Sequence, residues 1–180
     1  MPPWISHITS AQKKEIKLRS YKWIQLATIG LDNTPRVRTV VFRGWSEYYQ
    51  MKILTDSRSQ KYLELESNKN VEICWLFTEA KSQFRLRGTV EIDKSIDTYN
   101  HWDKLDSSTK SMWNWPSPGK KIVKSYKENY LINENPKIVE NFILLKINIF
   151  HVEELILRKP IHQRRRWILK NEWIEENINP

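Results

Sequence analysis

Two arginines at opposite ends of an apolar run are the first candidates for chemistry in this chain. The segment 38–43, Arg-Thr-Val-Val-Phe-Arg, predicts a strand with a guanidinium at each end. Arg38 could hold an anion and Arg43 a polarised ring edge, while free backbone amides of the segment could add hydrogen bonds. The plainer interpretation is a solvated strand face whose arginine stems cover apolar surface.

A second candidate is the segment 54–61, Leu-Thr-Asp-Ser-Arg-Ser-Gln-Lys, where a predicted strand runs into a helix through hydroxyl groups and a cation. The start of a helix presents unpaired N–H groups and the positive end of the helix dipole, and so it favours anions. Lys61, in the predicted first turn, could add a charge to a bound phosphate. A lysine is otherwise slightly unfavourable there, which mildly favours a functional reason, while the plainer interpretation is an ordinary N-cap.

Two further segments carry polar groups that could bind a ligand. Gln83 opens a long alternating strand and could offer a donor and acceptors to the edge of a heterocycle, or simply be a polar residue at a strand start. The stretch 158–170 has six cations, no acid and Trp167 among them. It could bind the phosphates of a nucleic acid or of a cofactor, or it could be a solvated charged face.

The elements that position these groups follow from the hydrophobic pattern. Period-two alternation and turn residues predict strands over 23–29, 36–45, 48–55, 71–78, 84–92, 143–149, 152–157, 165–169 and 173–176. Helices are predicted over 10–20, over the segment that ends at Leu65, around Trp102 and Tyr126, and after Pro136. Many short strands with helices at the margins predict an antiparallel β-barrel with α additions (α+β), and we expect one domain over 1–180.

Composition narrows the class of protein. Lys plus Arg is 30 and Asp plus Glu is 21, and the net charge of +9 points to an anionic partner such as nucleic acid, a membrane surface or a phosphorylated small molecule. With only four glycines, the chain has neither a dinucleotide fingerprint nor a P-loop. The longest apolar run is five residues, 73–77, so we expect no membrane span, which would take about 20.

Cysteine and histidine usage sets further expectations. Cys74 is the one cysteine, which rules out an intrachain disulfide, and the four histidines have no zinc-site spacing, so we expect no metal. No apolar stretch follows a basic start, so no secretory signal is expected. These features favour a cytoplasmic location.

The order and spacing of the polar motifs are more specific than any one of them. The run R-x-V-V-F-R, then L-T-D-x-x-S-x-K about ten residues later, then Q-F-R-x-x-G, resembles the pyridoxamine 5'-phosphate oxidase family of FMN-binding split barrels. The resemblance covers roughly 23–92, and it resumes more weakly over 142–180, where W-x-x-x-x-x-N-P is similar to the family's C-terminal tail. The chain looks closer to the flavoprotein relatives of the oxidase than to the oxidase itself.

The resemblance implies FMN as cofactor and a homodimer, because in the family the cofactor lies between two subunits. It implies that Arg38, Ser59, Gln60 and Lys61 hold the FMN phosphate. It implies flavin contacts from Thr39, Val40, Val41, Leu54, Thr55 and Gln83, and from Arg164 of the partner chain. Arg43 stands where the oxidases usually have lysine, and a cation at that ring edge favours the reduced flavin. The small-molecule substrate would contact Tyr99, Ser107 and His162.

Two departures from the family pattern concern the substrate. Asp103 and Pro160 stand where the oxidases have arginines that bind the substrate's phosphate. Each charge-assisted hydrogen bond is worth ~1.5–3 kcal/mol, so we expect pyridoxamine 5'-phosphate to bind weakly. The resulting hypothesis is an FMN-dependent oxidoreductase of unassigned substrate, in which the flavin carries the chemistry.

Two other classes of protein remain open at this stage. A basic β-barrel could bind nucleic acid without flavin, since the chain has 9 Trp, 7 Tyr and 5 Phe for stacking beside its positive charge. That function needs a continuous exposed basic and aromatic groove, whereas flavin binding needs Arg38, Lys61 and Gln83 to converge on one pocket. A split barrel could also hold another cofactor, such as haem or a deazaflavin, or none.

Overall fold

The computed structural model describes residues 1–93, 95–121 and 137–180. Its strands are β1 (Trp23–Ile29), β2 (Pro35–Trp45), β3 (Met51–Asp56), β4 (Asn70–Phe77), β5 (Ser82–Asp93), β6 (Phe142–Ile156), β7 (Gln163–Leu169) and β8 (Trp173–Ile178). Its helices are α1 (Trp4–Lys14), α2 (Gln60–Ser67), α3 (Ile96–Asp103) and α4 (Ser107–Ser111), with 3-10 turns η1 (Arg19–Lys22) and η2 (Met112–Asn114).

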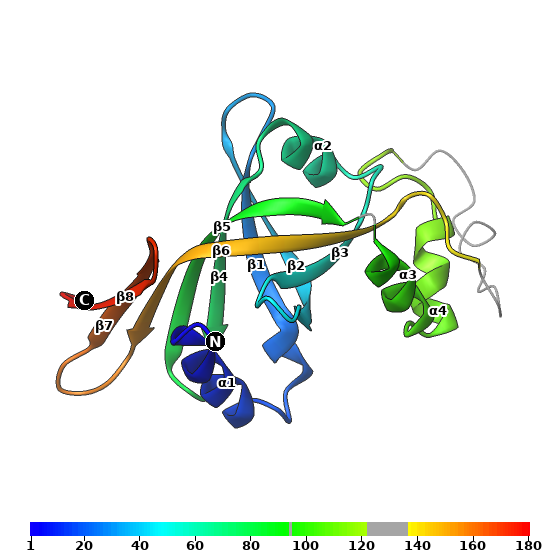
Figure 1. Cartoon of the computed structure of the whole chain (residues 1–180). Helices are drawn as coiled ribbons and strands as arrows, with labels where there is room; N and C mark the ends of the chain where they lie inside the picture. Colours follow the sequence, from blue (N-terminus) through cyan, green and yellow to red (C-terminus); the bar gives the residue numbers. More distant parts are fainter. Residues whose placement is uncertain (94, 122–136) are drawn as a thin grey trace.

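The strands form one antiparallel sheet in the order β3-β2-β1-β4-β5-β6-β7-β8, and β3 also pairs with β6. The second pairing closes β1 to β6 into a barrel, while β7 and β8 continue beyond it as a hairpin (Figure 1). The predicted antiparallel barrel with added helices is therefore confirmed. None of the described helices is both long and apolar enough to cross a bilayer.

The barrel interior is filled by the apolar residues of the alternating strands. On β4, Ile73, Trp75 and Phe77 are fully buried, and on β5 Phe84 and Leu86 face them. Aromatic rings make much of this core, as in the contact of Trp75 with Phe77 at 5.0 Å between ring centroids. The period-two pattern predicted these strands because one face of each is buried and the other is not.

The first helix begins earlier than predicted. The expectation of a helix over 10–20 with Ser10 as its cap is wrong, because α1 spans Trp4–Lys14. Its buried residues Trp4, Ile5, Ile8 and Ala11 form a helical stripe that packs into the main core. This packing, rather than the capping preference of a serine, sets the position of the helix.

Two strand boundaries also differ from the predictions. The third strand begins at Met51 instead of residue 48, because residues 46–50 form a turn in which the Ser46 N–H donates to the Gln50 carbonyl at 2.9 Å. The two strands expected over 143–149 and 152–157 are one strand, β6. A bulge opposite Arg87 and Gly88 lets β6 continue where the side-chain alternation shifts.

The helices after β5 are attached to the barrel by a second aromatic cluster. Trp102 of α3, Trp113 of η2 and Phe142 of β6 pack edge to face, with ring centroids 4.9–6.0 Å apart. Trp113 also donates from Nε1 to the Thr55 carbonyl at 3.1 Å. The predicted helix around Trp102 is confirmed, and the helix expected around Tyr126 lies outside the described residues. The helix expected from Pro136 is wrong, because residues 137–141 form no helix and lead into β6 through a turn in which the Phe142 N–H donates to the Val139 carbonyl at 3.0 Å.

Candidate functional site

A cluster of charged side chains lies where β1, β2 and the start of α2 meet. Arg38 of β2 places its Nη2 2.7 Å from Oε2 of Glu64 on α2, and its Nη1 also donates to the Thr28 hydroxyl. Thr28 in turn donates to the same Glu64 oxygen at 2.6 Å. The guanidinium is therefore held at one end of the barrel, beside the helix.

Lys61 brings a second cation to this place. Its Nζ donates to the hydroxyls of Thr55, at 3.1 Å, and Ser59, at 3.2 Å. Burial, followed by the nearby Arg38 guanidinium, lowers the pKa of Lys61. Two cations that lie close enough to influence each other favour an anion between or beside them. We call this group, Arg38, Thr55, Ser59, Lys61 and Glu64, the cation cluster.

The local sequence explains why the start of α2 is polar and open. Ser59 is the N-cap residue, but within the described chain its side chain makes no capping hydrogen bond; its hydroxyl donates to the Asp56 carbonyl at 2.6 Å. Asp56 is ion-paired with Arg58, with 2.6 Å between Oδ2 and Nη2. The positive end of the α2 dipole thus lies at the cation cluster. The first turn of the helix carries a lysine there and no acidic residue.

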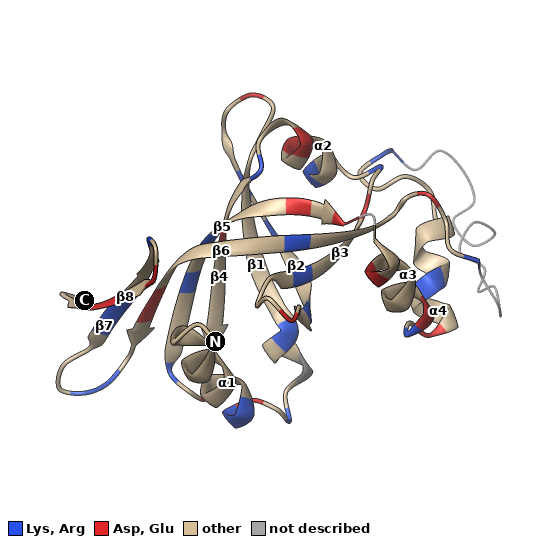
Figure 2. Ribbon diagram, viewed as in Figure 1, with Lys and Arg blue, Asp and Glu red and all other residues tan. Residues whose placement is uncertain are grey.

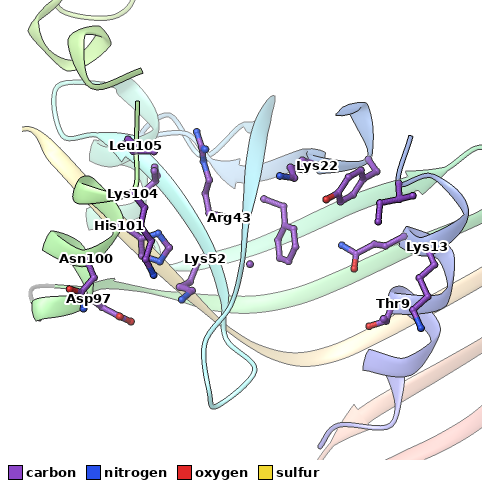
Figure 3. A pocket seen from close by; sticks show the side chains of 16 residues that line it. Thr9, Lys13, Lys22, Arg43, Lys52, Asp97, Asn100, His101, Lys104 and Leu105 are labelled. Atoms are coloured by element: carbon purple, nitrogen blue, oxygen red, sulfur yellow. The ribbon is translucent and has the colours of Figure 1, made fainter. Parts of the chain in front are cut away.

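A cavity of about 690 Å³ lies on the outer side of β2 and β3, between α1 and α3. Phe42, Arg43 and Leu54 lie along its floor. Figure 3 shows the α3 side chains on one side and those of α1 on the other. Leu54 lines the cavity and the next residue, Thr55, belongs to the cation cluster, but the alternation of β3 turns their side chains to opposite faces of the strand. β3 therefore contributes a residue to each of the two sites.

Positive charge dominates the cavity lining. The charged residues that line it are Lys13, Lys22, Arg43, Lys52, Lys104 and Asp97. Asp97 is compensated from outside, because Lys146 places its Nζ 2.9 Å from Asp97 Oδ2 and 3.2 Å from Asp93 Oδ2. This bridge also attaches the start of α3 to β6, and the cavity lining is left with a surplus of cations.

Two side chains in the cavity, Arg43 and His101, offer polar groups to a bound molecule. The buried Nε of Arg43 has no hydrogen-bond partner in the part of the chain that the structure describes. Burial, followed by the charge of Lys52, lowers the pKa of His101, so its imidazole is neutral near pH 7. Both groups can therefore bond to a molecule in the cavity, Arg43 as a donor and His101 as a donor or acceptor.

Gln83 and Arg164 lie elsewhere. They line a pocket of about 110 Å³ together with Arg85, Glu153 and Leu155 on β5, β6 and β7. Arg164 donates from Nη2 to Glu153 Oε2 at 2.5 Å. In the sheet, β1 and β4 separate β2, which carries Arg38, from β5, which carries Gln83. Within one chain, Arg38 and Lys61 come together but Gln83 does not join them.

The remaining predicted residues are distributed as follows. On β2, Thr39 is exposed, Val40 is buried in the barrel interior and Val41 is half-buried on the outer side. Gln60 is exposed in the first turn of α2. Tyr99, which is 53% exposed, the exposed His162, and Ser107 at the start of α4 are not among the residues that line the cavity.

The structure adds cavity residues that sequence reasoning missed. On α3 and directly after it they are Asp97, Asn100, His101, Lys104 and Leu105. Their spacing of three and four residues is a helical stripe, which is a signal that could have been found. Lys22 and Lys52 had no such signal, because their place beside the cavity depends on the tertiary structure.

Three of the six cations in the basic stretch 158–170 are paired with carboxylates of neighbouring strands. Arg164 contacts Glu153, and Arg165 places its Nε 3.4 Å from Glu154 Oε2. Arg166 lies 2.6 Å from Glu176. Figure 2 shows acidic segments of β6 and β8 on either side of the basic segment of β7. Carboxylates thus interrupt the positive charge along β7, whereas nucleic-acid binding needs a continuous basic groove.

The protein is a closed antiparallel barrel with a cationic helix start and a large, partly apolar cavity. These features are typical of barrels that bind a small ligand. The family model described as "Pyridoxamine 5'-phosphate oxidase, FMN-binding domain" matches residues 1–94. The chain belongs to this family, and its cofactor is FMN. At the level that the family determines, it is an FMN-binding protein.

Individual relatives support this membership. A pyridoxamine 5'-phosphate oxidase-related, FMN-binding protein from Nostoc punctiforme PCC 73102 is 31% identical, with a TM-score of 0.92 over 100% of this chain and 99% of that one. Pyridoxine/pyridoxamine 5'-phosphate oxidase 2 of Arabidopsis thaliana is 41% identical over 99 residues, which are 54% of this chain and 48% of that protein. The chain spans about half the length of the curated relatives it matches.

A more distant structure shares the fold. PhzG from Burkholderia lata 383, solved in complex with tetrahydrophenazine-1-carboxylic acid, is 16% identical, with a TM-score of 0.85 over 98% of this chain and 90% of that one. At this identity the likeness concerns the fold alone, which it extends over the C-terminal half that the family model leaves unmatched.

Proposed function

We propose that this protein is an FMN-dependent oxidoreductase that binds the FMN phosphate at the cation cluster. The observation that carries the proposal is the convergence of Arg38 and Lys61 at the start of α2, beside two strands, β2 and β3, that also line the cavity. A phosphate dianion would accept charge-assisted hydrogen bonds from both side chains and from the first N–H groups of the helix. Ser59 and the exposed Gln60 stand at the same helix start.

The residues beside the cavity fit the ring of FMN. The buried Nε of Arg43 lacks a partner among the described residues and can donate to a ring edge, while Leu54 supplies apolar contact. Val41 and the backbone of Thr39 and Val40 run between the two arginines. At a rise of about 3.3 Å per residue, Arg38 and Arg43 lie roughly 16 Å apart along β2 and can bind opposite ends of one elongated molecule. When bound, FMN supplies the capacity to accept and pass on a hydride.

We infer that the working unit is a homodimer of single-domain chains (1–180) in which a second copy supplies Gln83 and Arg164. In one chain these residues lie on strands far from the cation cluster in the sheet order. The outer face of β1, β2 and β4 exposes Trp23, Val37 and Leu76, which are large apolar side chains that a second copy would cover.

The substrate that the cavity fits is a small organic anion. Lys52 and Lys104 line it without a carboxylate partner among the described residues, and the apolar side chains of Phe42 and Leu105 would contact a planar body. Neutral His101 stands beside Lys52 as an acceptor for a substrate N–H or O–H. Tyr99, Ser107 and His162 do not line the cavity of a single chain. Their contacts with the substrate therefore stay predictions.

Cofactor titration tests the proposal directly. The purified protein, stripped of cofactor, should quench FMN fluorescence with one FMN per chain, and riboflavin, which lacks the phosphate, should bind much more weakly. Equal affinity for FMN and riboflavin would contradict the phosphate site. A protein that binds neither flavin but shifts an oligonucleotide at low salt would favour the nucleic-acid class instead.

The substrate is addressed by anaerobic reduction of the bound flavin with a panel of small amines, alcohols and acids. Pyridoxamine 5'-phosphate belongs in this panel because relatives are named for it. We expect negligible turnover of it, since Asp103 and Pro160 replace the cations predicted to bind its phosphate. Robust formation of the aldehyde product would show that this prediction is wrong.

A further inference from the structure

Glu64 is a carboxylate where a hydrophobic residue would be expected. It lies in the second turn of α2 and is 0% exposed. Its Oε2 accepts hydrogen bonds from Thr28 at 2.6 Å and Arg38 at 2.7 Å. Its Oε1 has no hydrogen-bond partner among the described residues. A buried carboxylate is costly even when it is paired, and this one is only half satisfied, so its presence calls for a role.

The three partners come from three different elements. Thr28 is on β1, Arg38 on β2 and Glu64 on α2, so the contacts fix the guanidinium relative to the start of the helix. Lys61 stands one turn before Glu64 on the same helix. A single turn of α2 therefore carries both the ammonium of the cation cluster and the carboxylate that holds its guanidinium.

The charge of the cation cluster also depends on Glu64. Arg38 and Lys61 are close enough for the guanidinium to lower the pKa of the ammonium. The carboxylate of Glu64 offsets one of these charges and opposes that effect. Without it, two partly buried cations would repel each other, and the long Arg38 side chain would be free to turn toward solvent.

We propose that Glu64 is a positioning residue for the cofactor phosphate, holding the Arg38 guanidinium at the start of α2 together with Thr28. This role rests on the phosphate site proposed above. Glu64 does not itself contact the phosphate, since like charges repel. A purely structural ion pair would stabilise the barrel without favouring phosphorylated ligands. The two interpretations predict different effects of Glu64 variants on the affinities for FMN and for riboflavin.

The test compares the dissociation constants of FMN and riboflavin for matched variants, with thermal melting as a check on folding. Glu64→Ala should weaken FMN binding by about tenfold or more and riboflavin by less than about twofold, because Arg38 is no longer oriented. Glu64→Gln keeps an acceptor for both donors and should restore most of the FMN affinity. Glu66→Ala, an exposed carboxylate on the same helix, is the control and should change neither constant.

Thr28→Val keeps the test valid if Glu64→Ala fails to fold. It preserves volume and removes one of the two bonds to Glu64, so FMN binding should weaken by about threefold with riboflavin unchanged. An unchanged ratio of FMN to riboflavin affinity in Glu64→Ala and Thr28→Val would overturn the positioning role. If the unmodified protein bound both flavins equally, the phosphate site itself would be wrong, and the positioning role with it.

Discussion

Gln83 and Arg164 stand on either side of one residue, Leu155. Gln83 of β5 pairs with Leu155 of β6, and Leu155 pairs with Arg164 of β7, so the two polar side chains lie on the same face of the sheet. In the order of the strands, β1 and β4 lie between β2, which carries Arg38, and β5, which carries Gln83. One chain thus carries two separate groups of predicted cofactor residues, and a dimer is the simplest way to bring them together.

A complementation experiment tests this arrangement. Arg38→Ala and Arg164→Ala should each abolish tight FMN binding in the pure variant. When the two variants are mixed and allowed to exchange subunits, half of the dimers are mixed and each has one intact site, so about a quarter of all sites should regain FMN. No recovery would mean that Arg38 and Arg164 act within the same chain, or that Arg164 is not a cofactor residue.

Replacing Lys61 by methionine should weaken FMN binding while leaving the fold intact. The substitution keeps the apolar stem and removes a charge-assisted hydrogen bond to the phosphate worth about 1.5–3 kcal/mol, which is roughly a tenfold to hundredfold loss of affinity. Fluorescence titration measures it. Lys69→Met, which removes an exposed lysine just beyond α2, serves as the control. Unchanged FMN affinity in Lys61→Met would show that the phosphate is bound elsewhere.

As the pH is raised, FMN affinity should begin to fall at a lower pH than the pKa of an ordinary lysine would predict. Burial, followed by Arg38, lowers the pKa of Lys61 in the folded protein, and a phosphate dianion binds the protonated form. Affinity is therefore lost as the pH rises through this lowered pKa, and the loss should be absent in Lys61→Met. The stability of the cofactor-free protein should change in the opposite sense and rise with pH there, because the unfolded chain binds more protons. Titration and urea melts across the alkaline range check both signs.

Gly88→Ala should destabilise the barrel. A Cβ at Gly88 would lie 2.6 Å from the Asn148 carbonyl oxygen and 2.8 Å from Cγ2 of Ile147, at the bulge between β5 and β6. Crowding of this kind costs about 1–3 kcal/mol, measurable as a lower urea midpoint. Alanine at the neighbouring exposed Arg87 should cost less, and equal stability of the two variants would contradict the close approach.

Much of the fold could be predicted because its determinants are local. The alternation of Val71, Ile73, Trp75 and Phe77 marks a strand whatever the rest of the chain does, since each second side chain must be buried. The polar run before Lys61 likewise marks a helix start. Prediction failed at α1 and at residues 46–50, where packing of Trp4 and a turn closed by Ser46 decided the boundaries.

What the sequence by itself determined is most of the strands, the barrel class and the lysine at the start of α2, because these depend on neighbours along the chain. Only the tertiary structure decided that Glu64 is buried against Arg38, that Lys52 and His101 share a cavity, and that Gln83 lies apart from Lys61. The physical reason is that barrel closure brings β3 against β6, and residues about 90 positions apart become neighbours through side-chain packing, which no local pattern encodes.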